Sequence, residues 1–491
     1  MTFISHEFVV FISIVVAVYF SLPRHRRWIW LLAASCYFYG SANPLFLVQI
    51  LLATAVAYAG ALQMEWAPDK SDKRRVLIVS LCLLITNLIA FKYTGFLNET
   101  LRKIFDGFGL PYPVPSFNIL LPLGISFYTF LLIGYLVDVF RGTRAERHAG
   151  IFSLHVLFFP KVVAGPIERT SNLLPQLHEP PPFTYQNGVL GLQLILWGVF
   201  QKAVVADRIA PFVDKVYNTP QAADGVMLSL ATVFYAFQIY CDFSGYTHIA
   251  LGVAAILGFK LIGNFNRPYF ATSVADFWKR WHISLTSWLT DYVYTPLTRQ
   301  RLVKIKYFTM MVTGLFITFV ISGFWHGAGW TFVIWGMLHG AYIVTSLLLQ
   351  KQRNQFVRWI GLDKWPTLHR AVKIAITFSL VCYAYIWFRA NSGTDALYIT
   401  THLFTGWGDP LDGLRKFIGS NPPSLRNFVL CLFGIAVVIA ADVLQGKTGG
   451  IRAVLGARPS WMRWGLYYAG AVSILLIGVI YTEQKFIYFR F

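Results

Sequence analysis

The feature that most constrains the fold of this chain is the recurrence of apolar runs that suit helices crossing a lipid bilayer. The hydrocarbon core of a bilayer is roughly 30 Å thick, and a segment inside it must satisfy its backbone hydrogen bonds internally. The clearest runs cover residues 8–22, 76–91, 117–140, 330–349, 428–444 and 464–482. Of the 491 residues, 56% are hydrophobic and 13% are charged, a balance too apolar for a soluble protein. The sequence therefore predicts an all-α polytopic membrane protein.

The formal net charge of +20 is concentrated in short connections between the apolar runs. If these basic connections face the cytoplasm, the chain alternates from an outside N-terminus to an outside C-terminus. The pattern predicts about eleven transmembrane helices, the first run being a retained span. Lipid head groups account for the charge, and we expect no nucleic-acid partner. The basic connections lie in 24–27, 70–75, 141–147, 299–306, 351–364 and 447–463.

Residues 150–340 differ in texture from the rest of the chain. Their apolar segments are interrupted by proline, glycine and charged residues, which is typical of re-entrant and interfacial helices that line a protein cavity. We expect a single membrane domain over 1–491, with N-terminal spans in 1–149, a functional core in 150–340 and C-terminal spans in 341–491.

Several classes of site find no support in the sequence. The five cysteines are scattered through apolar segments without a CxxC pair, so we interpret them as small buried hydrophobic residues. No H-E-x-x-H, G-x-S-x-G or G-x-G-x-x-G motif is present. Metal-ligand spacing is also missing, and we predict no metal site.

Two polar segments come first in the core. In 160-PKVVAGPIER-169, a re-entrant turn would offer Lys161 or Arg169 to an anionic ligand, whereas the spacing alone favours an interfacial loop with a local ion pair. In 240-YCDFSGYTHIA-250, Asp242 and His248 fall on opposite helix faces unless Ser244 and Gly245 break the helix. We expect Asp242 to bond backbone N–H groups where the helix restarts.

Two histidine-containing segments follow. Read as one helix, 276–294 turns His282 and Trp281 inward on an apolar, tryptophan-rich face, where His282 by itself resembles a satisfied core histidine. In 323-GFWHGAGWTFVIWGMLHG-340, His326 lies between two spans beside small glycines that allow close approach. Structural and functional interpretations of His326 are equally supported, and His339 is expected to point elsewhere.

Five segments in order resemble the membrane-bound O-acyltransferase (MBOAT) family, in particular its bacterial branch with the alginate O-acetylation membrane subunit. The D-alanyl transferase of teichoic acids is a relative in that branch. The resemblance implies a ring of tilted helices around a central pore. His248 departs from the pattern, since much of the branch has Asp there. The segments are 160–169, 240–252, 264–297, 322–340 and 486–491.

The resemblance also implies a reaction. An acyl group, in the first instance acetyl, would pass from a cytoplasmic thioester donor to a hydroxyl on the other side, for O-acetylation of an exported polysaccharide. His326 would abstract the hydroxyl proton and His282 would orient it or steady the oxyanion. Substrate-binding candidates are Lys161, Arg169, Asp242, Trp325 and Trp281.

The same resemblance suggests the setting. The donor would be acetyl-CoA or an acyl carrier protein, with no permanently bound cofactor. Extracytoplasmic acetyltransferase or polysaccharide-modifying proteins would be partners, and the location would be the bacterial inner membrane. The alternatives are D-alanyl or longer-chain acyl transfer to a cell-envelope polymer, or, in a different class, a transporter or flippase.

Overall fold

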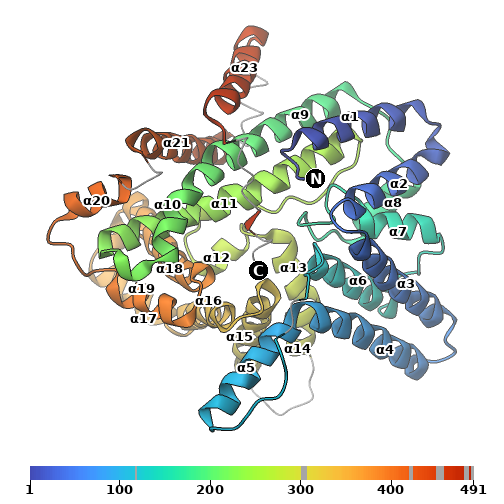
Figure 1. Ribbon diagram of the computed structural model, residues 1–491, viewed down its shortest axis with the longest axis horizontal. Coiled ribbons are helices and arrows are strands. Elements are labelled where there is room, and N and C mark those ends of the chain that lie inside the picture. The colour runs from blue at the N-terminus through green and yellow to red at the C-terminus, as the bar shows by residue number, and fades with distance from the viewer. Residues whose placement is uncertain (117–118, 300–306, 420–423, 449–457, 480–485, 488–491) are drawn as a thin grey trace. The chain divides into compact units, whose positions relative to one another are not determined.

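The structure is a computed structural model that describes residues 1–491 except for 117–118, 300–306, 420–423, 449–457, 480–485 and 488–491. Helix follows helix through the described residues, and no strand occurs among them (Figure 1). The all-α prediction is confirmed. Parts of the predicted runs 117–140 and 464–482, of the basic connections 299–306 and 447–463, and of the closing segment 486–491 lie outside the described residues.

Among the described residues, eight helical stretches are long and apolar enough to cross a membrane. Two shorter apolar helices, α1 (His6–Ser21) and α6 (Ile125–Phe140), coincide with further predicted runs. The polytopic membrane prediction is confirmed, whereas the total of about eleven spans and the central pore stay predictions. The eight stretches are Pro44–Trp66 (α3), Lys70–Gly107, Tyr185–Asn218, Gly225–Ile256 (α11), Phe308–His326, Trp330–Leu348 (α16), Pro366–Arg389 (α18) and Leu425–Gly446.

Helix starts follow ordinary capping chemistry. The Asn43 side chain accepts a hydrogen bond from Leu45 N at 2.9 Å, and Pro44 occupies the first position of α3. The Asp69 carboxylate likewise accepts from Asp72 N at 2.8 Å at the start of α4 (Lys70–Leu88). Such side chains satisfy backbone N–H groups that a helix start leaves without partners, so the local sequence fixes where these spans begin.

The chain forms two compact units. Unit 1 comprises Met1–Ile195 and Ile249–Ile262, and unit 2 comprises Leu196–His248 and Gly263–Phe491. Helices α9 (Tyr185–Val199) and α11 therefore contribute residues to both. Residues of the expected core 150–340 are divided between the units, and the single-domain interpretation stays a prediction.

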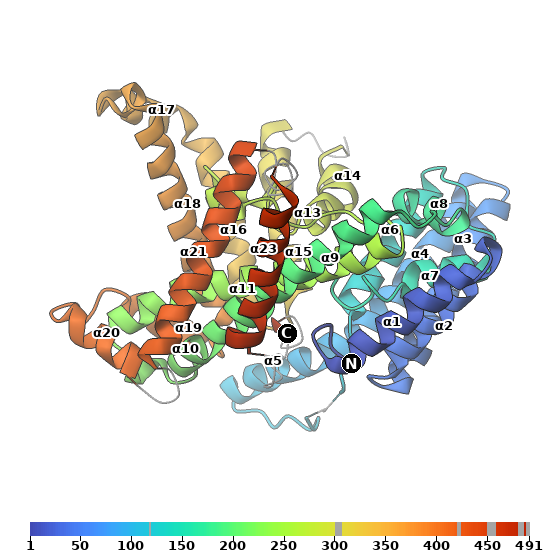
Figure 2. The ribbon, with the colours of Figure 1, turned by 90° about the horizontal axis from the view of Figure 1, so that it is seen from above.

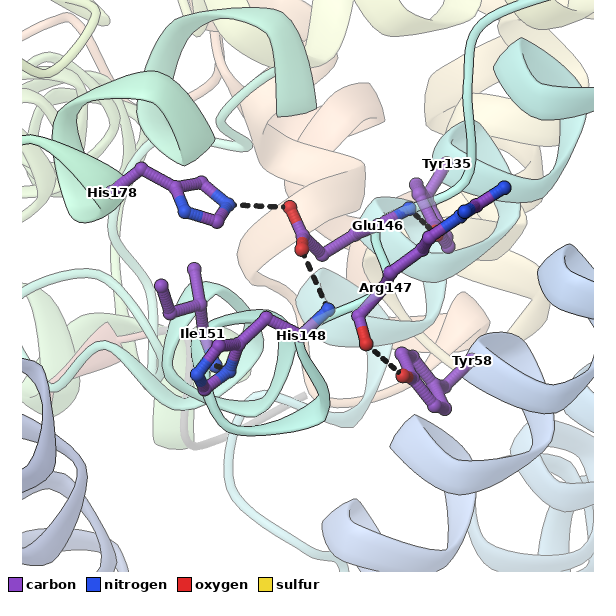
Figure 3. A network of polar contacts seen from close by, with 7 residues as sticks. All are labelled: Tyr58, Tyr135, Glu146, Arg147, His148, Ile151 and His178. Atoms are coloured by element: carbon purple, nitrogen blue, oxygen red, sulfur yellow. Dashed lines mark hydrogen bonds and ion pairs between the residues drawn. The ribbon is translucent and has the colours of Figure 1, made fainter.

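In unit 1, a polar network fixes the basic connection between α6 and α7 (Ala149–Leu157) (Figure 3). Glu146 accepts from the backbone N–H of His148 and contacts the His178 ring, both at 2.8 Å. The Tyr135 hydroxyl accepts from Glu146 N at 3.0 Å. This connection is therefore held by α6 and by the end of α8 (Thr170–His178).

In unit 2, helices α15 (Tyr307–His326) and α16 pack as an antiparallel pair. A short helix, α17 (Gln350–Trp359), then leads to one end of α18 (Figure 2). The buried core of unit 2 is rich in aromatic side chains from α11, α16 and α18. The two histidine-containing segments of the sequence belong to this unit.

Candidate active site

His282 lies at a break between two short helices. The predicted helix over 276–294 is wrong, because α12 (Val274–Trp278) ends first and α13 (Ile283–Leu289) begins after His282. His282 adopts left-handed backbone angles, φ 44° and ψ 53°. This conformation is uncommon for a residue other than glycine and persists only where surrounding contacts enforce it.

Asn264 supplies the contacts that enforce this break. Its carbonyl accepts from Ile283 N at 3.0 Å, and its side-chain oxygen accepts from Ser284 N at 3.2 Å. Asn264 is fully buried. It therefore caps α13 in place of His282. Sequence reasoning missed Asn264, since nothing local to it indicates a partner twenty residues away.

His326 is the last residue of α15, before a short turn that leads to Trp330 and α16. The imidazole rings of His282 and His326 are 6.4 Å apart between centroids and inclined by 64°. The Trp325 ring contacts both, at 5.7 Å from His282 and 4.9 Å from His326. The structure thus brings the two predicted catalytic residues and Trp325 together.

Aromatic rings enclose the histidine pair. His326 meets the Trp335 and Phe388 rings edge-on at 4.8 and 5.3 Å, and His282 meets Phe243 at 4.7 Å. His282 is fully buried and His326 is 3% exposed. Burial lowers the pKa of His282 to about 3, so this ring is neutral at physiological pH.

His339 has a different environment. The Trp278 indole N–H donates to His339 Nδ1 at 3.2 Å, which places the His339 proton on Nε2. The Trp335 ring contacts His339 at 4.9 Å and His326 at 4.8 Å, so it lies against both imidazoles. His339 is thus part of the aromatic packing behind His326.

The glycines near His326 serve helix packing more than open space. A methyl group at Gly323 would lie 2.4 Å from the Phe332 carbonyl oxygen, and one at Gly336 would lie 2.3 Å from that of Phe319. Gly323 therefore permits the close approach of α15 and α16. At Gly329 a methyl group would meet nothing nearer than 3.5 Å.

Asp242 lies in an unbroken helix, so the predicted helix break and restart are wrong. Helix α11 continues through Gly245. Glycine is required at this position because a methyl group would lie only 2.7 Å from the Gly198 carbonyl oxygen. Asp242 Oδ1 is 2.8 Å from Lys202 Nζ, and its Oδ2 accepts from Ile487 N at 2.7 Å. Sequence reasoning missed Lys202 as the partner of this carboxylate.

His248 and Trp281 also belong to unit 2. The His248 Nδ1 atom is 2.8 Å from Gln201 Oε1, so His248 belongs to the polar contacts between α11 and the residues after α9. Trp281 is buried, and its ring meets Phe265 at 5.0 Å and Tyr240 at 6.1 Å. The structure therefore places Trp281 in the aromatic core.

Lys161 and Arg169 belong to unit 1. Residues 154–168 are buried within unit 1, and the interfacial position expected for 160–169 stays a prediction. Among the described residues the Lys161 side chain makes no hydrogen bond or ion pair, and burial lowers the pKa of its amine to about 7. Burial also raises the pKa of Glu168, which accepts from Asn172 Nδ2 at 2.7 Å. Arg169 is half-buried at the start of α8.

His155, on α7, is a buried polar residue that sequence reasoning missed. Neither of its ring nitrogens has a partner among the described residues. Burial, with the nearby charge of Lys161, lowers its pKa well below the ordinary value. Its position inside an apolar helical run gave no indication of this environment.

Over the described part of the chain, no cluster of three or more His, Cys, Asp or Glu residues could hold a metal ion.

Known proteins match this chain over most of its length. Residues 151–388 match the family model described as MBOAT, membrane-bound O-acyltransferase family. The peptidoglycan O-acetyltransferase of Helicobacter pylori is 32% identical over 398 residues, 76% of this chain and 72% of that protein. The probable alginate O-acetylase AlgI of Azotobacter vinelandii is 33% identical over 414 residues, 83% of this chain and 79% of the relative.

The chain belongs to the membrane-bound O-acyltransferase family. It is similar at a lower level to the teichoic acid D-alanyltransferase of Bacillus subtilis, 29% identical over 307 residues, 59% of this chain and 74% of the relative. The family match contains His282 and His326, and it extends from α7 to α18.

The histidine pair suits the chemistry of an acyltransferase. The centroids of the two rings are 6.4 Å apart. Two hydrogen bonds of about 2.9 Å, one to each ring, can span this separation and meet at one small group such as a hydroxyl. A neutral imidazole offers one acceptor and one donor nitrogen, so the pair can both accept a proton and donate a hydrogen bond.

Proposed function

We propose that this MBOAT protein transfers an acetyl group from a thioester donor to a hydroxyl acceptor and so O-acetylates an exported polysaccharide. The observation that carries the proposal is that the rings of His282 and His326, which come from separate elements, lie close together inside one aromatic enclosure. The names of the relatives support acetyl as the acyl group and a cell-envelope or extracellular polymer as its destination.

His326 is the proposed general base. An effective base has a pKa near the working pH, and the pKa of about 3 makes His282 a poor proton acceptor. His326 would take the proton of the acceptor hydroxyl as its oxygen attacks the thioester carbonyl carbon. His282 would donate a hydrogen bond to the oxyanion that forms. Collapse expels the thiolate, which takes the proton from His326, leaving an ester and a free thiol.

The remaining roles rest on the same proposal. Trp325 lies against both histidines and would bound the space for the reacting groups. Lys161 and Arg169 would interact with the donor, and Asp242 and Trp281 would support the site without touching the reacting atoms. The donor would be acetyl-CoA or an acyl carrier protein, and no bound cofactor is required because a thioester is already activated.

The proposed setting is the bacterial inner membrane, with the donor on the cytoplasmic side. The basic connections support this orientation, with both termini outside. Extracytoplasmic proteins would then accept or direct the acetyl group. The D-alanyltransferase similarity favours one second candidate, transfer of D-alanine to an envelope polymer, although that relative aligns with a smaller share of this chain.

A transfer assay on membranes containing the protein tests this function. The membranes receive acetyl-CoA labelled in the acetyl group. Label is counted in the polymer, and the free CoA released is measured separately through its thiol. We expect His326→Ala to lower the rates of polymer labelling and of CoA release by about 10³-fold or more. The matched control is His25→Ala, an exposed histidine in the first basic connection, which should retain activity. Full transfer by folded His326→Ala would overturn the assignment.

A further inference from the structure

Three described residues near the C-terminus, Val479, Phe486 and Ile487, contact the interior of unit 2. After α23 (Ser460–Ile477), Val479 N donates to the Ala203 carbonyl at 2.9 Å. Further on, Ile487 N donates to Asp242 Oδ2 at 2.7 Å. Ala203 lies in a π-helical turn, Phe200–Ala206, a geometry that often marks functional sites. Val479 and Ile487 are thus each tied by a backbone N–H to the region of Lys202 and Asp242.

Asp242 is held in place by charge. Its Oδ1 atom pairs with Lys202 Nζ at 2.8 Å, and the same ammonium pairs with Asp207 Oδ1 at 2.7 Å. All three side chains are buried. A buried carboxylate is tolerated only with such partners, and its hydrogen bond to a backbone N–H is stronger than one between neutral groups. The ion pair at Oδ1 therefore orients the carboxylate whose Oδ2 accepts from Ile487 N.

The residue before Ile487 connects this anchor to the histidine pair. The Phe486 ring stacks on Tyr246 at 4.9 Å and lies 6.1 Å from Phe243. Phe243 in turn meets the His282 ring edge-on at 4.7 Å. Phe243 and Tyr246 are on successive turns of α11, beside Asp242. A continuous chain of contacts therefore runs from Phe486 through Phe243 to His282.

We propose that Phe486 and Ile487 form part of the wall of the catalytic centre, and that Lys202 and Asp242 are positioning residues that hold this wall against Phe243. The inference rests on the proposed acyl transfer by the histidine pair. Phe243 is packed by Phe265 at 5.1 Å on one hand and by Phe486 at 6.1 Å on the other. Loss of the Phe486 ring would leave Phe243, and with it the His282 ring, less firmly oriented. Small displacements of a catalytic group lower the rate steeply, whereas substrate affinity is set by other contacts.

Phe486→Ala and Asp242→Ala test the proposal in the full-length protein. For each variant we would measure kcat, KM for acetyl-CoA and the melting temperature. Both should lower kcat by about tenfold or more while KM changes by less than about twofold. The double variant should be no slower than the slower single variant, because both changes break one chain of contacts. Asp242→Asn, which keeps an acceptor oxygen for Ile487 N, should recover part of the loss.

Phe417→Ala is the matched control. Phe417 is a fully buried phenylalanine of unit 2 whose ring packs against Phe212 and Phe234. It should lower the melting temperature at least as much as Phe486→Ala, yet leave kcat within about twofold. Wild-type kcat in Phe486→Ala, an equal loss of kcat in Phe417→Ala, or multiplied losses in the double variant would each overturn the proposal.

His326→Ala, assayed in the same preparation, separates this inference from the proposed function. If His326→Ala is inactive and Phe486→Ala has wild-type kcat, the histidine mechanism stands and the positioning role fails. If His326→Ala retains full transfer, the proposed function itself fails, whatever the C-terminal variants do.

Discussion

The histidine pair of unit 2 and the segment 154–168 of unit 1 are two buried polar regions that the protein treats differently. In unit 2, the His282 and His326 rings lie 6.4 Å apart between centroids within aromatic walls, and the pKa of His282 is low enough to keep it neutral. In unit 1, burial drives Lys161 and Glu168 toward their neutral forms, and among the ion pairs of the described residues none joins these two side chains.

The difference concerns the cost of burial. A histidine has an ordinary pKa near 6.5, so keeping it neutral at pH 7 requires little free energy. Keeping a lysine near neutrality opposes a pKa near 10.4 and costs several kcal/mol. Keeping the histidine site uncharged therefore requires little free energy. Lys161 is costly, and this cost is our reason for expecting it to act on a ligand.

After His326→Ala, the largest effect is expected when the donor role of His282 is removed. His282→Leu removes the hydrogen bond to the oxyanion and should lower kcat by about 10²-fold, with KM for the donor nearly unchanged. His282→Asn, whose amide can still donate, should retain more activity. The measurement is single-turnover transfer from labelled acetyl-CoA. Equal activity of the two variants would remove His282 from the chemistry and leave it a packing residue.

The packing behind His326 comes next. Gly323→Ala places a methyl group against the Phe332 backbone, which cannot yield without separating α15 from α16. We expect a loss of about 1–3 kcal/mol of stability and about tenfold lower kcat. Gly329→Ala has room and an extended φ of −167°, so its melting temperature should match wild type. Equal melting temperatures for all three proteins would contradict the packing role of Gly323.

In unit 1, Lys161→Met should separate stability from function. The apolar side chain removes the burial cost of the amine, so we expect stability to rise by about 1–3 kcal/mol at pH 7. If Lys161 binds the donor, KM for acetyl-CoA should rise several-fold. Lys260→Met, at an exposed position of the same unit, is the control and should change neither quantity. Lower stability of Lys161→Met would mean that Lys161 has a stabilising role.

The smallest effect is the pH dependence of stability. The folded pKa of His282 is about 3, below the unfolded value near 6.5, so the unfolded chain binds more protons between these values. Stability should therefore fall as pH drops below about 6.5, by at most about 1.4 kcal/mol per pH unit from this residue. His282→Asn should have a shallower slope in melting experiments from pH 7 to 5. An unchanged slope would place His282 in a solvated environment.

The sequence predicted the parts of the molecule that depend on composition and order. Apolar runs predicted the all-α membrane fold, and the order of five segments predicted the family and the two histidines. What could not be predicted depends on distant partners. Asn264 caps α13 in place of His282, and Asp242 accepts a hydrogen bond from the backbone N–H of Ile487, 245 positions away. Helix α11 stays intact at Gly245 because tertiary packing against Gly198 outweighs the local helix-breaking signal.

The burial of individual residues could not be predicted from the sequence either. The segment 160–169 has the prolines, glycine and charges of a surface loop, yet its residues up to Glu168 are buried in unit 1. The glycines near His326 suggested room for a substrate, but the Phe332 backbone occupies the space beside Gly323. Both cases show that glycine and proline mark irregular backbone without saying whether protein, water or ligand lies against it.

A double-mutant cycle on the histidine pair tests most directly whether His282 and His326 act as one centre. Single-turnover transfer is measured for wild type, His282→Leu, His326→Gln and the double variant, with a labelled donor that resolves about five decades of rate. Residues that act as a unit lose activity non-additively. We predict that the double variant is no slower than His326→Gln alone. Losses that multiply would show that the two histidines act independently and would contradict a shared centre.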